Sequence, residues 1–527
     1  MRTAFITRTC VVLLLLAAAL ALALRCPRLD VRPMHNDEGV NALKFGALWE
    51  SHAYKYDPQE HHGPTLPYAT LAFAWLTRAP DFDHFSEARL RTLTVLFGVG
   101  LILLLPLISD ALGHRAAIWA ALFTAVSPAM VFYSRYYIHE MLLVFFTFLA
   151  LGASWRYWRS RKPGWALLAG AAIGLLCATK ETFVLTGGAA IIALFLNHVW
   201  NRALDASGPP VKAAPINRWH LLAAAGAWFF VVVLLFSSFL TNPAGLVDSF
   251  KTYQPWLSRA GGASTHLHSW TFYLHRLLFF HVAKGPVWAE ALILVLAVVG
   301  GVAAFRRVHL GSASASFIRF LALYTFLLTA FYSLIAYKTP WCLLSFWHGA
   351  ILLAGVGAGV LLRSIPRLVP RISFAVILLI GAIHLGWQAW LASNTPEFAA
   401  DRRNPYVYAQ TSPDILGLVS TVESLARVAP QNRNLLVQVI APDDDYGPLP
   451  WYLRSFKQVG WWSKTPSDLS AQVLIVSPAV HFKPSANDPL RMLGYFQLRP
   501  QTLFELWVEP SLMQSLQSST SPPRVAQ

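Results

Sequence analysis

The stretch WCLLSFWHGAILLAGVGAGVLL, residues 341–362, contains no Lys, Arg, Asp or Glu. Its length and apolar character are what a helix needs to cross the hydrocarbon core of a bilayer. Comparable runs recur along most of the chain, although several are shorter than the about 20 residues of an untilted span. The sequence predicts spans near residues 9–25, 90–109, 116–133, 141–157, 164–178, 182–199, 219–240, 288–304, 317–336, 341–362 and 373–392.

The overall composition agrees with a protein that lies mostly in lipid. A chain of 527 residues with 55% hydrophobic and 13% charged residues cannot be a set of ordinary soluble domains. Its net charge of +16 resides largely in short loops between apolar runs. We therefore expect the charge to set membrane topology and expect no nucleic-acid partner. The four cysteines show neither disulfide nor metal-site spacing.

The distribution of Lys and Arg predicts the orientation in the membrane. Arg2 and Arg8 precede an apolar run from Val11 to Leu24, which resembles a signal peptide but which we interpret as an uncleaved first span. With a cytoplasmic N-terminus in the inner or plasma membrane, alternation places most basic loops inside. Those loops contain Arg115, Arg156, Arg159, Arg161, Lys162, Arg306, Arg307, Arg319, Arg363, Arg367 and Arg371.

The expected fold is an α-helical polytopic membrane protein with about 11 transmembrane helices and a small C-terminal α/β domain outside the cytoplasm. The membrane domain covers residues 1–392, and its long outer loops are 26–89 and 241–287. A stretch from Thr65 to Thr77 is too short to cross and predicts a helix at the membrane surface. Residues 393–514 form the soluble domain and 515–527 a disordered tail. The predicted strands of the soluble domain are Leu435–Ile440 and Gln472–Val476.

An acidic pair lies about ten residues beyond the first span, in His35-Asn36-Asp37-Glu38-Gly39. Adjacent side chains on a helical turn project about 100° apart, so the two carboxylates cannot serve one point equally. One would act, for example as a general base, and the other would orient or bind. The alternative is a solvated loop or a helix N-cap formed by Asn36 or Asp37.

Ionisable residues also gather where outer loops meet the predicted spans. Such groups are costly at a membrane boundary unless they are paired or face a cavity, although snorkelling side chains and local ion pairs are the alternative interpretation. A rigid turn, His61-His62-Gly63-Pro64, leads into the surface stretch. The boundary residues are Arg135, His139, Glu140, Lys180, Glu181 and Lys338.

These motifs resemble the GT-C superfamily of polyprenyl-phosphate-sugar-dependent glycosyltransferases, in particular the branch of protein O-mannosyltransferases and lipid A aminoarabinose transferases. The resemblance rests on Asp37-Glu38, on His62-Gly63-Pro64-Thr65-Leu66 and on Ser127-Pro128 with Arg135 and Glu140. In the second motif, Gly63 replaces the first proline of a His-Pro-Pro-Leu-like pattern.

Four segments are similar to a subfamily known as flippase-activity-associated proteins of archaeal N-glycosylation. They are 36–39 (NDEG), 62–64 (HGP), 337–341 (YKTPW) and 446–454 (YGPLPWYLR).

The resemblance implies an inverting transfer of a sugar from a polyprenyl-phosphate donor to an acceptor protein, lipid or glycan outside the cytoplasm. Asp37 would be the general base, and Glu38 or Glu140 would orient it or, with Asp37, hold a divalent metal ion. Arg135, Lys180 and Lys338 would neutralise the leaving phosphate. The histidines of the donor and acceptor loops would be His61, His62 and His139.

Two other functions compete with this interpretation. A lipid-linked sugar flippase or transporter would also carry ionisable residues, but those would be expected in the middle of the spans. A catalytically silent accessory factor of glycan assembly would keep the scaffold without the chemistry. In the C-terminal domain, Asp443-Asp444-Asp445 predicts an acidic turn or a cation or sugar site. The aromatic residues there form either core or a glycan platform: Trp451, Tyr452, Trp461 and Trp462.

Overall fold

The computed structural model describes residues 8–59, 62–204, 215–261, 266–466, 469–484 and 490–520. The chain divides into two compact units. The first, called here the helical unit, comprises Met1–Leu29, Ser51–Arg78 and Ala88–Tyr408. The second, called the α/β unit, comprises Asp30–Glu50, Ala79–Glu87 and Ala409–Gln527. Parts of the first outer loop thus cluster with the C-terminal residues, a grouping that differs from the division at residue 392.

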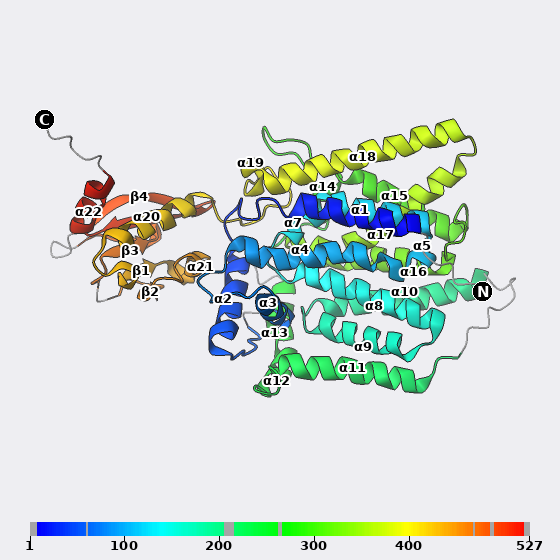
Figure 1. Cartoon of the computed structure of the whole chain (residues 1–527), viewed down its shortest axis with the longest axis horizontal. Coiled ribbons are helices and arrows are strands. Elements are labelled where there is room, and N and C mark those ends of the chain that lie inside the picture. The colour runs from blue at the N-terminus through cyan, green and yellow to red at the C-terminus, as the bar shows by residue number, and fades with distance from the viewer. Residues whose placement is uncertain are drawn as a thin grey trace. The chain divides into compact units, whose positions relative to one another are not determined.

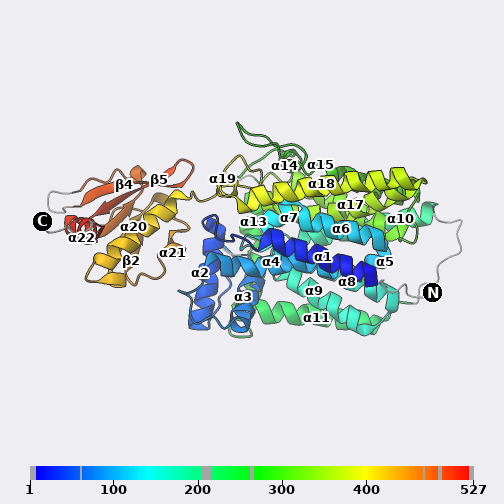
Figure 2. The ribbon, with the colours of Figure 1, turned by 45° about the horizontal axis from the view of Figure 1, so that its top comes forward.

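The helical unit is a bundle whose long helices run roughly parallel (Figures 1 and 2). Its first helices are α1 (Arg8–Arg25), α3 (Thr65–Leu76), α4 (Glu87–Leu104), η1 (Leu105–Leu107), α5 (Ser109–Leu112), α6 (His114–Val126), α7 (Pro128–Ser134), α8 (Glu140–Ser160), α9 (Pro163–Cys177) and α10 (Phe183–Leu204). The bundle continues with α11 (Arg218–Phe236), α12 (Ala244–Lys251), α13 (Tyr253–Ala260), α14 (Phe272–Leu278), α15 (Ala291–Arg306), α16 (Ala315–Leu334), η2 (Pro340–Leu343), α17 (Leu344–Ser364), α18 (Leu368–Asn394) and α19 (Pro396–Ala399).

Within the described residues, eight helices are long and apolar enough to cross a membrane. A further pair, α6 and α7, passes the same test with a bend of 58° at Ser127, and α3, α9 and α15 are shorter apolar helices. Every predicted span overlaps one of these helices or the bent pair. The prediction of a polytopic α-helical membrane protein is confirmed, while the number of spans and the surface location of α3 remain predictions.

The uncharged apolar segment at residues 341–362 lies at the centre of the bundle. Helix α17 is buried at every residue from Leu344 to Val360. Close packing depends on small residues, because neighbouring helices in a membrane gain stability mainly from van der Waals contact. A Cβ atom at Gly357 would lie 1.9 Å from the carbonyl oxygen of Leu296 on α15. Glycine at this position therefore allows α15 and α17 to approach backbone to backbone.

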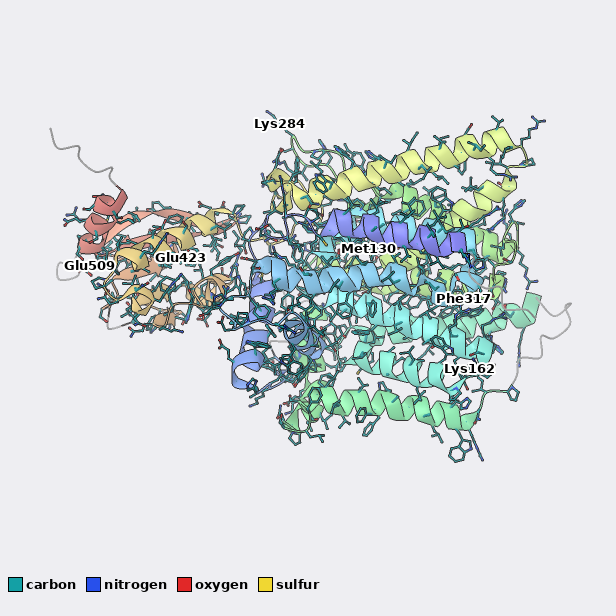
Figure 3. All side chains as sticks on the ribbon, viewed as in Figure 1. Met130, Lys162, Lys284, Phe317, Glu423 and Glu509 are labelled. Atoms are coloured by element: carbon teal, nitrogen blue, oxygen red, sulfur yellow. The ribbon has the colours of Figure 1, made fainter. Side chains whose placement is uncertain are left out.

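The basic loops predicted to share one side of the membrane lie at one end of the bundle. Figure 3 labels Lys162 and Phe317 there, and Lys284, from the loop predicted outside, at the opposite end. This arrangement agrees with the predicted alternation of loops. Which end faces the cytoplasm stays a prediction.

The α/β unit contains a five-stranded mixed sheet, whose strands lie in the order β2 (Val459–Trp462), β1 (Val437–Ile440), β3 (Val473–Val476), β5 (Thr502–Val508) and β4 (Arg491–Arg499). Strand β1 is parallel to β2 and β3, whereas β5 is antiparallel to β3 and β4. Figure 2 shows α20 lying against the strands. The elements are α2 (Asn36–Ser51), α20 (Asp414–Val428), η3 (Asn432–Asn434), β1 (Val437–Ile440), η4 (Pro442–Asp444), α21 (Leu449–Tyr452), β2 (Val459–Trp462), β3 (Val473–Val476), η5 (Pro478–Val480), β4 (Arg491–Arg499), β5 (Thr502–Val508) and α22 (Pro510–Thr520).

The core of this unit follows the alternation of side chains along the strands. Val439 and Ile475 contribute to one cluster, together with the apolar face of α20. Leu474 contributes to a smaller cluster on the opposite face. The two strands predicted from sequence correspond to β1 and β3, so the predicted α/β domain is confirmed. Helix α22 extends into the segment expected to be disordered, because Leu512 anchors it on the first cluster.

Candidate functional site

The acidic pair lies at the first turn of α2, in the α/β unit. The Glu38 side chain is fully buried, accepts a hydrogen bond from the backbone N–H of His35 at 2.9 Å and lies 3.8 Å from Arg32 Nη2. The Asp37 side chain is 45% exposed, and its Oδ1 lies 3.7 Å from His35 Nδ1. The two carboxylates therefore differ in environment. The Glu38 carboxylate is hydrogen-bonded at the start of α2, whereas the Asp37 carboxylate is accessible to a ligand.

Two of the four subfamily-like segments pack against each other here. A Cβ at Gly39 would lie 2.9 Å from Pro448 Cβ, so the start of α2 lies directly on the 446–454 segment. The Tyr452 hydroxyl accepts a hydrogen bond from the backbone N–H of Met34 at 2.8 Å. Segment 446–454 thus positions the acidic pair from about four hundred residues away in sequence.

A second group of charged residues lies in the helical unit, between the ends of α7, α8, α9 and α10. Lys180 and Glu140 form a buried ion pair, with side chains 6% and 3% exposed. Burial opposes the charged ammonium, but the carboxylates of Glu140 and Glu181 outweigh it and raise the pKa of Lys180. The pairing therefore favours the charged form of the amine in a poorly hydrated place.

The next residue forms a second ion pair. Glu181 Oε2 lies 2.9 Å from His62 Nδ1. Burial would raise the pKa of the Glu181 carboxyl, but the charge and hydrogen bond of His62, with help from Lys180, lower it to about 2. Both residues stand out in the sequence, but only the fold shows that they are partners.

The turn at residues 62–65 explains the departure from the His-Pro-Pro-Leu-like pattern. A Cβ at Gly63 would lie 2.1 Å from the carbonyl oxygen of Ala178, and the N–H of Gly63 donates to Thr179 at 3.1 Å. Proline has a Cβ and lacks the N–H, so it fits neither contact. The Gly63 carbonyl in turn lies 3.0 Å from Nε2 of His139, a buried residue whose pKa burial lowers well below its usual value.

The other two predicted phosphate ligands contact main-chain carbonyls. Arg135 Nη1 donates to the carbonyl oxygen of Pro27 at 2.6 Å and to Oδ1 of Asn394 at 2.9 Å. The guanidinium therefore lies at the C-terminal end of α1. Lys338 Nζ donates to the carbonyl of His268 at 3.0 Å. These contacts give both cations a structural role, and their role as phosphate ligands stays a prediction.

The predicted residues thus fall into two groups. Glu140, Lys180, His62 and His139 come together in the helical unit, while Asp37 and Glu38 belong to the α/β unit. His61 lies outside the described residues. Within the residues that the structure describes, no three His, Cys, Asp or Glu side chains gather in a way that could hold a metal ion. The proposed metal pair of Asp37 and Glu140 stays a prediction.

One buried acid, Glu290, was not among the site residues predicted from sequence. Glu290, at the start of α15, is fully buried and accepts hydrogen bonds from the N–H of Ala129 at 2.9 Å and from the Tyr406 hydroxyl at 2.7 Å. Ser127 and Trp347 also donate to this carboxylate. The position of Glu290 at the edge of an apolar run can be recognised in the sequence. Its four hydrogen-bond partners come from distant segments and cannot.

The acidic turn of the C-terminal segment has a local explanation. Asp443 and Asp444 adopt left-handed backbone conformations, which Asp tolerates better than most residues. Asp445 forms an ion pair with Arg499. Trp451 is buried, whereas Trp461 is half-buried and its ring lies 4.8 Å from that of Tyr446. The turn is thus part of the framework, and Trp461 retains a partly accessible surface.

The bundle of apolar helices with a small mixed-sheet unit defines the class of protein: an integral membrane protein with the GT-C fold. Residues 61–216 match the family model described as dolichyl-phosphate-mannose-protein mannosyltransferase. That segment contains the Glu140–Lys180 and His62–Glu181 pairs. Comparison of the sequence with curated proteins gives no match.

Solved structures extend the similarity over most of the chain. ArnT from Cupriavidus metallidurans bound to undecaprenyl phosphate is 13% identical, with a TM-score of 0.61 over 95% of this chain and 98% of its own. The oligosaccharyltransferase of Archaeoglobus fulgidus, with a tethered acceptor peptide, is 14% identical, with a TM-score of 0.54 over 88% of this chain. The present chain covers 64% of that enzyme. These similarities show the fold, and membership of the archaeal flippase-associated subfamily stays a prediction.

Proposed function

We propose that this protein is a membrane glycosyltransferase that transfers a sugar from a polyprenyl-phosphate donor to an acceptor protein, lipid or glycan outside the cytoplasm. The observation that carries the proposal is the buried Lys180–Glu140 pair, a cation kept charged at the helix ends inside the segment that matches the mannosyltransferase family. The ArnT structure, which has the same fold, binds a polyprenyl phosphate.

In the proposed reaction, Asp37 accepts the proton of an acceptor hydroxyl. The hydroxyl oxygen then attacks C1 of the donor sugar while the bond between C1 and the phosphate oxygen breaks, which inverts the anomeric centre. The exposure of Asp37 suits this role because its carboxylate can meet a ligand. Glu38, buried and hydrogen-bonded at the same turn, would fix the orientation of its neighbour.

Lys180 would stabilise the polyprenyl phosphate as negative charge develops on the leaving oxygen. An ammonium in a poorly hydrated site interacts strongly with such charge, because little water screens it. Glu140 keeps the amine protonated and aimed before the phosphate arrives. Arg135 and Lys338 are the next candidates for phosphate contact, and Asp37 with Glu140 the candidates for a divalent ion.

The test is transfer of radiolabelled sugar from polyprenyl-phosphate donors by the purified protein in lipid nanodiscs. Replacing Asp37→Asn is expected to lower transfer by about 10²- to 10⁴-fold, the contribution of a general base. Lys180→Met should lower turnover more than donor binding, because the charge acts mainly in the transition state. The control is Glu423→Gln, a half-exposed carboxylate on α20 that pairs with Arg433.

Each outcome separates the candidate functions. Equal transfer by the wild type and Asp37→Asn would remove Asp37 from the mechanism. Transfer with none of the donors would instead favour a silent accessory factor, and movement of the intact lipid-linked sugar across the bilayer would favour a flippase.

A further inference from the structure

The α/β unit contains a cavity of about 430 Å³ that none of the proposed catalytic residues lines. Its walls come from the second half of α2, the turn at residues 82–83 and the segment that leads from α21 into β2. The polar and aromatic lining residues are Glu50, Phe82, Asp83, Arg454, Phe456, Lys457 and Trp461. All of them belong to the α/β unit, so the cavity is complete within one compact part of the chain.

The cavity is separate from the proposed catalytic base. Asp37 lies in the first turn of α2 and Glu50 near its last residue. With a rise of 1.5 Å per residue, the two positions are about 20 Å apart along the helix. A ligand held beside Glu50 would therefore not contact Asp37 through the same group.

The charges of the lining balance. Glu50 and Asp83 are exposed carboxylates, and Arg454 and Lys457 supply two cations. The two carboxylates would repel an anionic ligand, and the two cations would repel a cationic ligand. Neither kind of ligand is therefore favoured over a neutral one. Carboxylates accept several hydrogen bonds each, and guanidinium and ammonium groups donate several each. This combination suits a neutral molecule with many hydroxyl groups.

Aromatic side chains complete the lining. Trp461 is half-buried on the edge strand β2, and the buried ring of Phe82 on the 82–83 turn also lines the cavity. An indole face offers a large apolar area that packs well against the C–H face of a sugar ring. Hydroxyl groups at the rim of that ring would then reach the charged side chains.

The walls are fixed without a ligand. Arg454 donates to the carbonyl of Phe85 at 2.6 Å and to that of Trp451 at 2.7 Å, with its guanidinium 3.7 Å from the Trp451 ring centre. A Cβ at Gly46 would lie 2.6 Å from the ring of Phe82, so glycine sets how closely α2 approaches this turn. A preformed site loses less entropy on binding than a flexible one.

From this lining we infer that the cavity is a saccharide-binding subsite for one or two sugar residues of a neutral glycan. The volume falls in the about 300–1,000 Å³ range of small-ligand sites. The inference goes beyond the proposed transfer reaction, because binding in this cavity requires neither Asp37 nor Lys180.

The test measures saccharide binding to the full chain in lipid nanodiscs by saturation-transfer difference NMR, without any polyprenyl donor. The probes are mannotriose, maltotriose and N,N′-diacetylchitobiose, with a neutral tripeptide as the alternative ligand. At least one saccharide is expected to bind, and Trp461→Ala should weaken it by about ten-fold. The matched control is Tyr495→Ala, an exposed aromatic residue on β4, at the opposite edge of the sheet.

Two further variants keep the result interpretable. Glu50→Gln with Asp83→Asn alters only exposed groups and should weaken binding severalfold while preserving the fold. Asp37→Asn should bind saccharide like the wild type, which separates this inference from the proposed catalysis. Absence of binding for all three saccharides, equal binding by Trp461→Ala and wild type, or preference for the tripeptide would overturn the inference.

Discussion

At the residue scale, two largely buried ion pairs in the helical unit share one turn. Lys180 and Glu181 are neighbours in sequence, but their side chains select different partners, Glu140 and His62. Pairing is expected because an isolated charge in a poorly hydrated site is expensive. The consequence is that the turn between α9 and α10 is tied to the start of α8 and to the 62–65 turn.

The Glu181 carboxyl gives this arrangement a pH dependence. Its pKa in the folded protein, about 2, lies below the ordinary value of 4.5. The stabilisation is thus fully present above about pH 4.5 and is lost as the pH falls toward 2. We expect it to be on the order of 1–3 kcal/mol, because one pKa unit corresponds to about 1.4 kcal/mol.

Thermal unfolding of the detergent-solubilised protein between pH 6 and pH 3 measures this effect. Glu181→Gln should unfold at a lower temperature than the wild type at pH 6, and the difference should shrink as the pH falls. Glu423→Gln serves as the half-exposed control. A difference between Glu181→Gln and wild type that stays constant over this range would contradict the assignment.

At the element scale, the turn at residues 62–65 docks on the end of α9 through backbone hydrogen bonds and the Thr65 hydroxyl, which donates to the carbonyl of Leu175 at 3.3 Å. The N–H groups of Gly63 and Thr65 donate to Thr179 and Ala178, both at 3.1 Å. This places His62 beside Glu181 and begins α3 at Thr65. The close approach is possible only because residue 63 lacks a Cβ atom.

Replacing Gly63→Ala should therefore destabilise the protein by about 1–3 kcal/mol, the usual cost of overpacking. The matched control is Gly187→Ala on α10, where an added Cβ meets nothing within 4 Å. We expect a lower unfolding temperature for Gly63→Ala only, together with weaker donor binding if His62 shifts. Identical unfolding temperatures for the two variants would show that the turn does not need glycine.

At the scale of the whole molecule, the motifs noted in the sequence segregate between the two units. Residues 36–39 and 446–454 meet in the α/β unit, whereas residues 62–64 and the Glu140–Lys180 pair lie in the helical unit. The proposed reaction requires both units on the same side of the membrane, the extracytoplasmic side that the distribution of Lys and Arg predicts.

Reporter fusions test this topology. Alkaline phosphatase fused after Ala400 should be active, because that enzyme folds only outside the cytoplasm, and a fusion after Lys162 should be inactive. Green fluorescent protein at the same sites should give the opposite pattern. Cytoplasmic signals from the Ala400 fusion would place the C-terminal residues on the side opposite to the predicted one and would refute the proposed transfer.

The sequence alone predicted the class of fold because lipid imposes a strong, local requirement. A helix must present a continuous apolar run to cross a bilayer, so the spans and the basic loops can be read from neighbouring residues. Strands β1 and β3 were readable for a similar reason, as short apolar runs in a polar segment. The half-exposed edge strand β2 and the amphipathic strands β4 and β5 carry no comparable signal.

The sequence also singled out Asp37, Glu140 and Lys180 as candidate site residues. The energetic cost of a charged side chain depends on its position relative to the spans, which can be read from sequence. Tertiary structure decided which partner each one has, since Glu140 and Lys180 are forty residues apart and meet only when α8 packs beside α9. It also decided that the start of α2 packs on Pro448 and that a cavity lies between α2 and β2. Such contacts arise from packing between distant segments, and no local pattern of residues encodes them.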